Sequence, residues 1–343
     1  MRRFPRWLKI LGILIPLLLL ILAAALFGLG WYVRSQILDS GGTLPASMAA
    51  YDVVHYHLEV SVDPVEQVIE GANSVTVRTL AALDHFEIHL DEHLQVRSVT
   101  ENGENLSFTH RKGVVRAKLA APWRQGERRE ITIAYGGAPK VALRPPWIDG
   151  FVWSETPTGQ PWIGVTSQGD GGDVWWPCKD HPSDEPDEGM TISLTVPSEL
   201  VGLTNGRKVA ERDNGDGTTT FHWSETYPIT TYLVMVAISN YIEVTSLPDL
   251  YNGMPLTYYC YPEHLALAEN QFAQVYDLIE LFSNKLGEYP FIDEKHASIE
   301  IPMGSSGMEH QTVTCISDDW MDRAATPVIV GHEVAHQWFG DWV

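Results

Sequence analysis

The feature that most limits how this chain can fold is a series of short segments, from Tyr51 to about residue 245, in which apolar and polar residues alternate. Successive side chains of a β-strand point to opposite faces of a sheet, so this alternation predicts strands with one buried face. The alternating apolar positions are Tyr56, Leu58, Val60 and Val62, then Phe86, Ile88 and Leu90, then Ile192, Leu194 and Val196. The segment Asp213-Asn214-Gly215-Asp216-Gly217 is typical of a hairpin turn. We therefore predict an antiparallel all-β domain over residues 51–245.

The pattern changes near Pro248, and residues 246–343 predict a second domain that combines helices and strands. Residues 263–286 carry apolar side chains at helical spacing, which predicts one long helix. Residues 297–301 and 312–316 are typical of short strands. Thr326 and Pro327 are suited to begin a further helix whose apolar faces predict that it is mostly buried.

That last predicted helix contains His332-Glu333-Val334-Ala335-His336, an H-E-x-x-H motif. Histidines four positions apart lie on one helix face, so His332 and His336 can both point at one metal ion. This is a zinc-ligand pattern of metallopeptidases, in which the glutamate, here Glu333, takes a proton from the attacking water as general base. The chain has 13 histidines, so a chance match is the competing interpretation, and the surrounding residues have to decide between the two.

The surrounding residues carry a family resemblance. The stretch Val330-Gly331-His332-Glu333-Val334-Ala335-His336-Gln337-Trp338-Phe339-Gly340-Asp341 resembles the zinc aminopeptidases of the alanyl aminopeptidase (aminopeptidase N) type, which are gluzincin metallopeptidases. Upstream, Ser306-Gly307-Met308-Glu309-His310 resembles the exopeptidase motif G-[AG]-M-E-N of that family, and departs from it at Ser306 and His310. The resemblance implies that Glu309 binds the free α-amine of a peptide, and that Gly307 and Met308 belong to the substrate-binding segment.

The resemblance covers roughly residues 50–343. The segment Trp175-Trp176-Pro177-Cys178-Lys179-Asp180-His181-Pro182 looks like the W-F-P-C-x-D-x-P segment of the family, and Gln168 falls where relatives place a glutamine that helps to bind the amine. The implied fold is an all-β, saddle-like sandwich followed by the start of an α+β, thermolysin-like catalytic domain. The implied cofactor is Zn²⁺, and the implied substrates are peptides with a free N-terminus, so we favour an exopeptidase over a thermolysin-like endopeptidase.

The resemblance also implies residues that the sequence does not contain. The third zinc ligand of the family is a glutamate on the following helix, at a position beyond residue 343, and the tyrosine that stabilises the tetrahedral intermediate lies further on. Asp341 follows His336 on another face of the helix and does not replace that ligand. We therefore expect a C-terminally truncated sequence. Two functions stay open: a membrane-anchored zinc metallo-aminopeptidase or its N-terminal fragment, and a non-catalytic peptide-binding fragment with an incomplete zinc site.

The N-terminus predicts a membrane anchor. Residues 1–9 are basic, residues 10–33 form an uninterrupted apolar run, and residues 34–50 are typical of a stalk. As a helix, the apolar run is long enough to cross a hydrocarbon core of about 30 Å. The competing interpretation is a cleaved signal peptide ending near Ala23-Ala24-Ala25, but its apolar segment is usually shorter. The bias of positive charge predicts a single-pass protein of the cell membrane with a cytoplasmic N-terminus and an extracytoplasmic bulk.

Composition excludes some partners and leaves others open. The net charge is −21, which argues against nucleic acid as a partner. Hydrophobic residues make up 44% of the chain, enough for a sizeable core. The chain has three cysteines without a C-x-x-C pair, which allow at most one disulfide and are more typical of small buried residues. The sequence indicates neither the oligomeric state nor the preferred N-terminal residue of a substrate.

Overall fold

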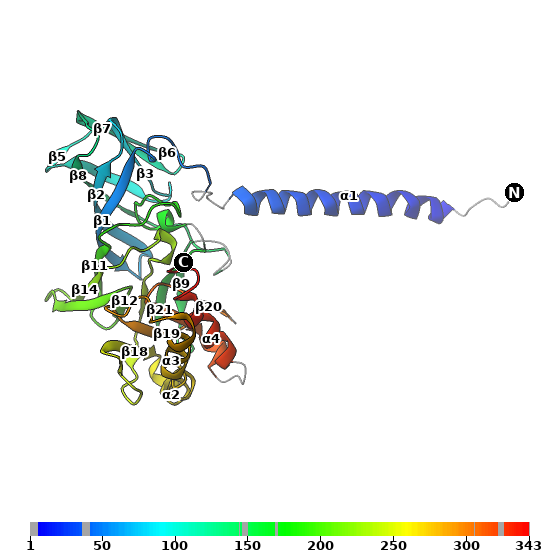
Figure 1. Ribbon diagram of the computed structural model, residues 1–343. Helices are drawn as coiled ribbons and strands as arrows, with labels where there is room; N and C mark the ends of the chain where they lie inside the picture. The colour runs from blue at the N-terminus through cyan, green and yellow to red at the C-terminus, as the bar shows by residue number, and fades with distance from the viewer. Residues whose placement is uncertain are drawn as a thin grey trace. The chain divides into compact units, whose positions relative to one another are not determined.

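The computed structural model describes residues 6–35, 42–143, 145, 150–168, 171–304, 306–321 and 326–342. The chain divides into two compact units, Met1–Asp39 and Ser40–Val343. The first unit holds helix α1 (Arg6–Ser35), and the second holds every strand that the structure describes and the helices around them (Figure 1).

The predicted membrane-spanning segment is corrected by the structure. Among the described residues, no helix is both long enough and apolar enough to cross a membrane. The anchor at residues 10–33 and the single-pass location at the cell membrane are therefore not supported.

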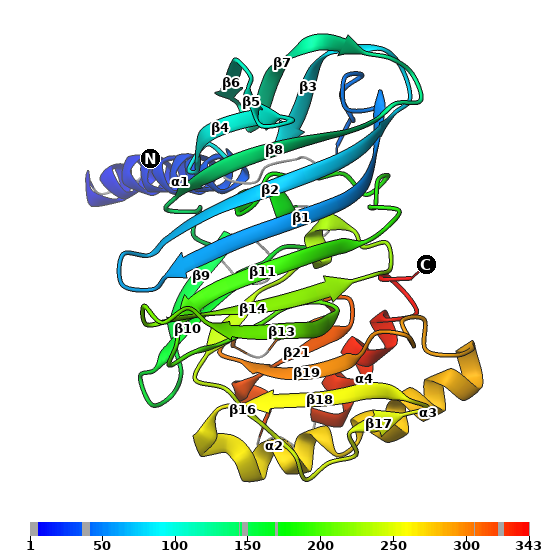
Figure 2. The ribbon, with the colours of Figure 1, turned by 90° about the vertical axis from the view of Figure 1, so that its left-hand side faces the viewer.

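The largest sheet of the second unit has eight strands in the order β13-β14-β11-β1-β2-β8-β4-β5 (Figure 2). Their bounds are β1 Tyr51–Asp63, β2 Val68–Thr79, β4 Gln95–Glu101, β5 Glu104–Asn105, β8 Arg128–Gly137, β11 Met190–Pro197, β13 Arg207–Asp213 and β14 Thr218–Glu225. The predicted alternation is observed, because β1 buries Tyr56, Leu58 and Val60 while the residues between them are more exposed. The strands pair antiparallel except for β1 and β11, which are parallel. The antiparallel prediction is therefore right for all pairs but one.

Two smaller sheets complete the β-rich region. One has the order β3-β7-β6 and the other β12-β15-β10-β9. Their bounds are β3 Leu83–His89, β6 Phe108–Arg111, β7 Val114–Trp123, β9 Gly150–Glu155, β10 Pro161–Thr166, β12 Val201–Leu203 and β15 Ala237–Ser239. Large aromatic side chains fill the space beside these strands, and Trp123, Trp162, Trp175 and Trp176 are almost fully buried. The described residues thus contain a β-rich region of the predicted kind.

The remaining strands form a mixed sheet that carries the helices. Its order is β16-β18-β19-β21-β20, with β17 paired to β18. The bounds are β16 Ile242–Glu243, β17 Leu250–Tyr251, β18 Met254–Cys260, β19 His296–Ile301, β20 Gly307–Met308, β21 Val313–Ser317, α2 Leu265–Phe272, α3 Val275–Leu286 and α4 Thr326–His336. One apolar core joins this sheet to the helices, including Phe272 of α2, Ile279 of α3, and Val330 and Val334 of α4.

The single helix predicted for residues 263–286 is wrong in one respect, because it is divided into α2 and α3. The side-chain amide of Gln274 donates a hydrogen bond to the backbone oxygen of Gln271, 2.7 Å away. Such a side-chain bond competes with the helical ladder at the point of interruption. Phe272 and Val275 flank the break and are both fully buried, so the bend lets each half face the core.

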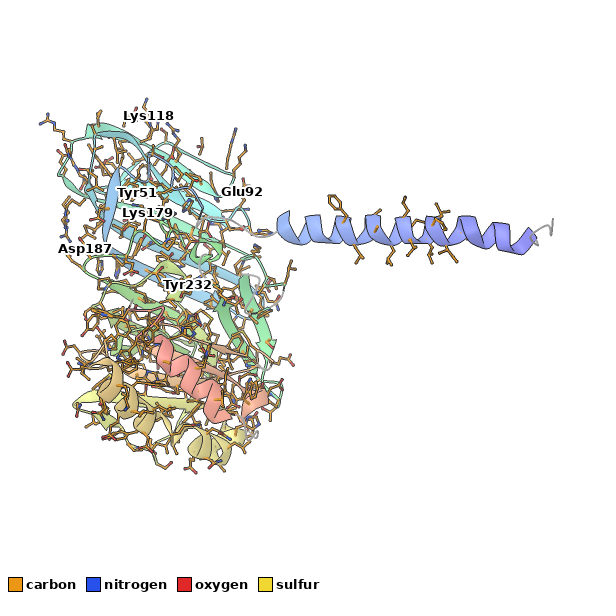
Figure 3. The ribbon with its side chains drawn as sticks, turned by 45° about the vertical axis from the view of Figure 1, so that its right-hand side comes forward. Tyr51, Glu92, Lys118, Lys179, Asp187 and Tyr232 are labelled. Carbon is orange, nitrogen blue, oxygen red and sulfur yellow. The ribbon has the colours of Figure 1, made fainter. Side chains whose placement is uncertain are left out.

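The loop between β10 and β11 contains a buried ion pair, and both members of the pair are hydrogen-bonded to the backbone of β1. Lys179 and Asp184 form this pair with side chains only 4% and 3% exposed. The Lys179 ammonium also donates a hydrogen bond to the Tyr51 backbone oxygen at 2.6 Å and lies over the Tyr51 ring; both residues are labelled in Figure 3. The neighbouring Cys178 is free and buried, as are Cys260 and Cys315, which confirms the prediction of buried small residues.

Candidate active site

Helix α4 brings the two motif histidines together. The Nε2 atoms of His332 and His336 are 3.3 Å apart, and the ring centroids are 4.7 Å apart. The opposite face of the helix is anchored in the core by Val330 and Val334, which are fully buried. The local helical spacing and this apolar anchoring together direct both imidazoles to the same side of α4.

A second contact sets the protonation of His336. Its Nδ1 atom donates a hydrogen bond to the backbone oxygen of Phe339 at 2.9 Å. A neutral imidazole that carries its proton on Nδ1 leaves the Nε2 lone pair available, which is the arrangement that metal-binding histidines usually show. The turn that follows α4 thus prepares His336 as a ligand through Nε2.

Glu333 lies on the inner side of the same helix. Its side chain is buried, with 4% of the residue exposed. Burial, and secondarily the negative charge of Glu309, raise the pKa of Glu333 to about 8. A carboxyl group with a pKa near neutrality can both accept and release a proton, as a general base must.

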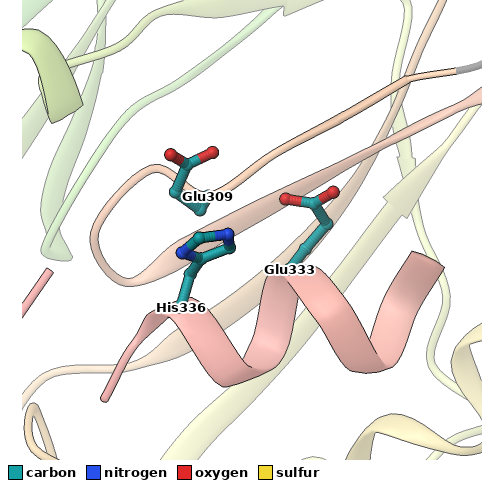
Figure 4. A group of neighbouring side chains, drawn as sticks. All are labelled: Glu309, Glu333 and His336. Atoms are coloured by element: carbon teal, nitrogen blue, oxygen red, sulfur yellow. The ribbon is translucent and has the colours of Figure 1, made fainter. Parts of the chain in front are cut away.

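Glu309 approaches this helix from the edge of the mixed sheet. It directly follows β20, in which Gly307 and Met308 pair with Ile316 and Cys315 of β21. Ligand atoms of Glu309, Glu333 and His336 all lie within 4.8 Å of one another, and Figure 4 shows the three side chains as neighbours. Among the described residues, these three side chains form a group that could hold a metal ion, and the predicted ligand His332 is not part of it.

Gly307 matters for this approach because it leaves space for Glu333. A Cβ atom at position 307 would lie 2.1 Å from Glu333 Oε1 and 2.4 Å from Glu333 Cδ. Both distances are far below ordinary van der Waals contact. A side chain at this position would therefore displace the Glu333 carboxylate from where it now lies beside strand β20. Met308, in contrast, is buried with 1% exposed.

The histidine pair fits a zinc ion. Zinc–nitrogen bonds of about 2.0–2.1 Å at a tetrahedral angle place two ligand nitrogens about 3.3 Å apart, the separation observed between His332 and His336. A catalytic zinc site takes three protein ligands. The two imidazoles thus have the spacing of zinc ligands, and the carboxylates of Glu309 and Glu333 are acidic neighbours of His336.

The turn after Glu309 is held in an unusual backbone conformation. Thr312 has a φ of +64°, which is rare for a β-branched residue. The amide of Val313 donates to the His310 backbone oxygen at 2.8 Å and closes the turn. The His310 ring is buried and donates from Nδ1 to the Leu233 backbone oxygen at 3.2 Å, and burial lowers its pKa to about 4. His310, the departure from the family motif, therefore acts as a neutral anchor in this chain.

Gln168 lies on a neighbouring loop and is exposed. The preceding residue, Ser167, donates from Oγ to the Tyr232 backbone oxygen at 2.9 Å. Burial raises the pKa of Tyr232, and the charge of Glu309 adds to the effect. The Ser167 hydrogen bond thus joins the Gln168 loop to the segment that contains Tyr232, labelled in Figure 3.

Three residues were given no role in the site from the sequence: Tyr232, Gln337 and Asp341, the last considered only as a zinc ligand and rejected. The sequence contained one usable signal, because Gln337 directly follows His336 and is a polar residue on a mostly apolar helix. In the structure Gln337 is fully buried and bonds to Asp341. Burial, together with the charges of Glu309 and Glu333, raises the pKa of Asp341 well above its usual value.

Comparison with known proteins places this geometry in context. Residues 53–233 match the Peptidase M1 N-terminal domain family. Glutamyl aminopeptidase of Homo sapiens is 30% identical over 182 residues, which are 49% of this chain and 18% of the relative. Leukotriene A-4 hydrolase of Xenopus laevis is 22% identical over 310 residues, which are 87% of this chain and 49% of the relative. The chain thus spans less than half the length of either relative.

Solved structures show the same fold. The M1 zinc metallopeptidase of Deinococcus radiodurans superposes with a TM-score of 0.69 at 23% identity, covering 85% of this chain and 65% of that protein. A mutant of it, bound to a Tyr-Ser-Ala substrate, has a TM-score of 0.71 at 22% identity and covers 89% and 67%. These structural matches cover a larger share of the chain than residues 53–233 do.

Proposed function

Since the chain belongs to the M1 peptidase family through its N-terminal domain, we propose that its site serves the zinc-dependent removal of N-terminal residues from peptides. His332 and His336 hold the metal, because their Nε2 atoms have ligand spacing and the His336 tautomer is set by Phe339. Zinc, when bound, polarises the scissile carbonyl and makes a water molecule more acidic.

Each acidic residue has its own part in this proposal. Glu333 accepts a proton from the attacking water and delivers it to the departing amine nitrogen, because its raised pKa suits both transfers. Glu309 binds the substrate ammonium through charge-assisted hydrogen bonds. Gln168, Gly307 and Met308 belong to the substrate-binding surface, Gln168 as a second amine contact and Gly307 as the open position beside Glu333.

The observation that carries the proposal is the closeness of Glu309 to the metal-binding pair. The α-amine of a peptide is about 2.5 Å from the carbonyl carbon of the same residue, from standard bond lengths. A carboxylate that binds this amine must therefore lie within a few ångströms of the metal, and Glu309 lies within 4.8 Å of both Glu333 and His336. Such a carboxylate blocks longer substrates from extending past it, which favours an exopeptidase.

A second candidate function is the binding of peptide N-termini without turnover. One observation favours it: the described residues place two histidine nitrogens at ligand spacing, whereas a catalytic zinc ion takes three protein ligands. Under this alternative Glu309 still binds the amine, but zinc binds weakly and hydrolysis is negligible.

The proposal can be tested with the full 343-residue chain and Co²⁺ as a spectroscopic substitute for zinc. We expect Co²⁺ absorption bands that disappear in His336→Ala, and a band shift when leucine hydroxamate is added. N-acetyl-leucine hydroxamate should bind on the order of 10-fold more weakly, because it cannot present an ammonium group to Glu309.

Glu309→Gln should remove that difference, whereas the same change at the exposed Glu280 of α3 should not. Equal affinity of the wild type for the two hydroxamates would overturn the proposal. Hydrolysis of leucine p-nitroanilide that is lost in Glu333→Gln would decide for turnover, and its absence would decide for the second candidate.

A further inference from the structure

We infer that Gln337 is a positioning residue that fixes the distance between the amine-binding Glu309 and the metal-binding helix. The inference rests on the proposed function, because it assigns Gln337 to the same site. Gln337 follows His336 directly, and its side chain is fully buried. It points away from the imidazole pair, toward the turn formed by residues 309–312.

The hydrogen bonds of Gln337 join that turn to α4. Its Oε1 accepts from the Thr312 amide at 2.8 Å and from the Tyr289 hydroxyl at 2.9 Å. Its Nε2 donates to the His310 backbone oxygen at 3.2 Å and to Asp341 Oδ2 at 2.6 Å. The Glu309 backbone oxygen lies 3.5 Å from Nε2, and since an amide has two hydrogens, this longer contact shares one of them.

These contacts act on the two peptide units that follow Glu309, through the backbone oxygens of Glu309 and His310, and on the strained end of the turn at Thr312. The left-handed conformation of Thr312 costs free energy, so it persists only where its surroundings hold it. Gln337 holds Thr312 from the side of α4, and the Gly206 amide holds its hydroxyl at 2.9 Å from the β-rich region. Without the Gln337 bond to Thr312, the turn stays attached to the β-rich region but can shift relative to the histidines.

The β-rich side of the turn has independent contacts. Asn205 donates to the Gln311 backbone oxygen at 2.7 Å, and Gln311 donates from Nε2 to the Pro228 backbone oxygen at 3.0 Å. With these bonds intact, removal of the Gln337 amide changes the placement of Glu309 and not the formation of the turn. A displacement of about 1 Å is enough to weaken a charge-assisted hydrogen bond strongly.

The test replaces Gln337 by methionine, which has nearly the same shape but cannot make these hydrogen bonds. The matched control is Gln271→Met in α2, where a buried glutamine bonds to the Met321 backbone oxygen at 2.7 Å and does not touch the turn. The measured quantity is the ratio of affinities of the Co²⁺-loaded chain for leucine hydroxamate and N-acetyl-leucine hydroxamate.

We expect Gln337→Met to lower this ratio at least about fivefold by weakening only the ligand with a free amine. Co²⁺ affinity and binding of the acetylated ligand should remain close to wild type, which a general loss of stability would not allow. Gln271→Met should leave the ratio unchanged. Amide hydrogen exchange should become faster at Thr312 in Gln337→Met.

The experiment separates failure of the proposed function from failure of this inference alone. If the wild type shows no preference for the free amine, the proposed function fails and this inference fails with it. If the wild type shows the preference and folded Gln337→Met retains it, the inference alone is overturned. Gln337→Glu serves if the methionine variant does not fold, because it keeps the acceptor oxygen for Thr312 and Tyr289 but loses both donors. Retention of the preference in that variant would equally overturn the inference.

Discussion

Replacement of Lys179 by methionine should destabilise the fold more than the loss of one partner from an exposed ion pair. The side chains of Lys179 and Asp184 are only 4% and 3% exposed, so the ammonium group compensates a carboxylate that has little access to water. Removing one partner of a buried ion pair typically costs about 3–5 kcal/mol, because the other charge stays buried without compensation. The variant also leaves the buried Tyr51 backbone oxygen without the donor that reaches it at 2.6 Å.

The loss should depend on pH in a defined direction. Burial raises the pKa of Asp184, whereas the charge of Lys179 lowers it, so removal of Lys179 raises that pKa further. At low pH the lone carboxyl group takes up a proton in the folded state, and the uncompensated charge disappears. The difference in free energy of unfolding between wild type and Lys179→Met should therefore be larger at pH 8 than at pH 5.

Urea unfolding followed by tryptophan fluorescence at both pH values measures this difference. The double variant Lys179→Met with Asp184→Leu should recover much of the loss, since it removes both charges. The control is Arg128→Met, which breaks a doubly hydrogen-bonded but exposed pair with Glu188, whose side chains are 55% and 52% exposed; its expected cost is below about 1 kcal/mol. A loss for Lys179→Met as small as that of Arg128→Met would refute the reasoning.

Three further changes test other parts of the structure. Burial, and then the charge of Glu294, raise the pKa of Glu225 from 4.5 to about 8. Between these two values the folded state keeps a proton that the unfolded chain releases. The stability that the protonated Glu225 contributes is therefore fully present below pH 4.5 and is lost as the pH rises toward 8. Glu225→Gln should flatten this decline, which is at most about 1.4 kcal/mol per pH unit, and parallel curves in urea unfolding from pH 5 to 8 would contradict the assignment. Gly307→Ala should change stability by less than about 1 kcal/mol, because a flexible side chain can move, but should displace the Glu333 carboxylate in a crystal structure. Gly206→Ala should cost about 2 kcal/mol or more in thermal unfolding, because φ is +69° and the added Cβ would lie 2.2 Å from the Ser224 backbone oxygen; a cost near zero would show that the backbone yields there.

The sequence predicted the strands well because their signal is local. Alternation over a few residues identifies β1 or β11 as strands with one buried face, whatever their partners are. It does not identify the partners, and the parallel pairing of Tyr56 with Met190 joins segments that are distant in the chain. The break between α2 and α3 was missed for the opposite reason, since a single side-chain bond from Gln274 outweighed a helical pattern that continues on both sides.

The candidate site likewise combines a local feature that the sequence predicts with long-range contacts that it does not. The spacing of His332 and His336 lies within one turn of one helix, so local geometry alone predicts their convergence. The positions of Glu309, Tyr232 and Asp341 depend on how α4 packs against the turn after β20, and no sequence pattern encodes that contact.

What the sequence by itself determined is therefore the β-rich character of residues 51–245 and the convergence of His332 and His336 on one helix face, because each depends on neighbours in the chain. What only the tertiary structure decided is the 4.8 Å grouping of Glu309 with Glu333 and His336, the open position at Gly307, and the role of the Gln337 amide between them. These features depend on long-range packing, in which a difference of about 1 Å separates contact from its absence and which periodicity along the chain does not record.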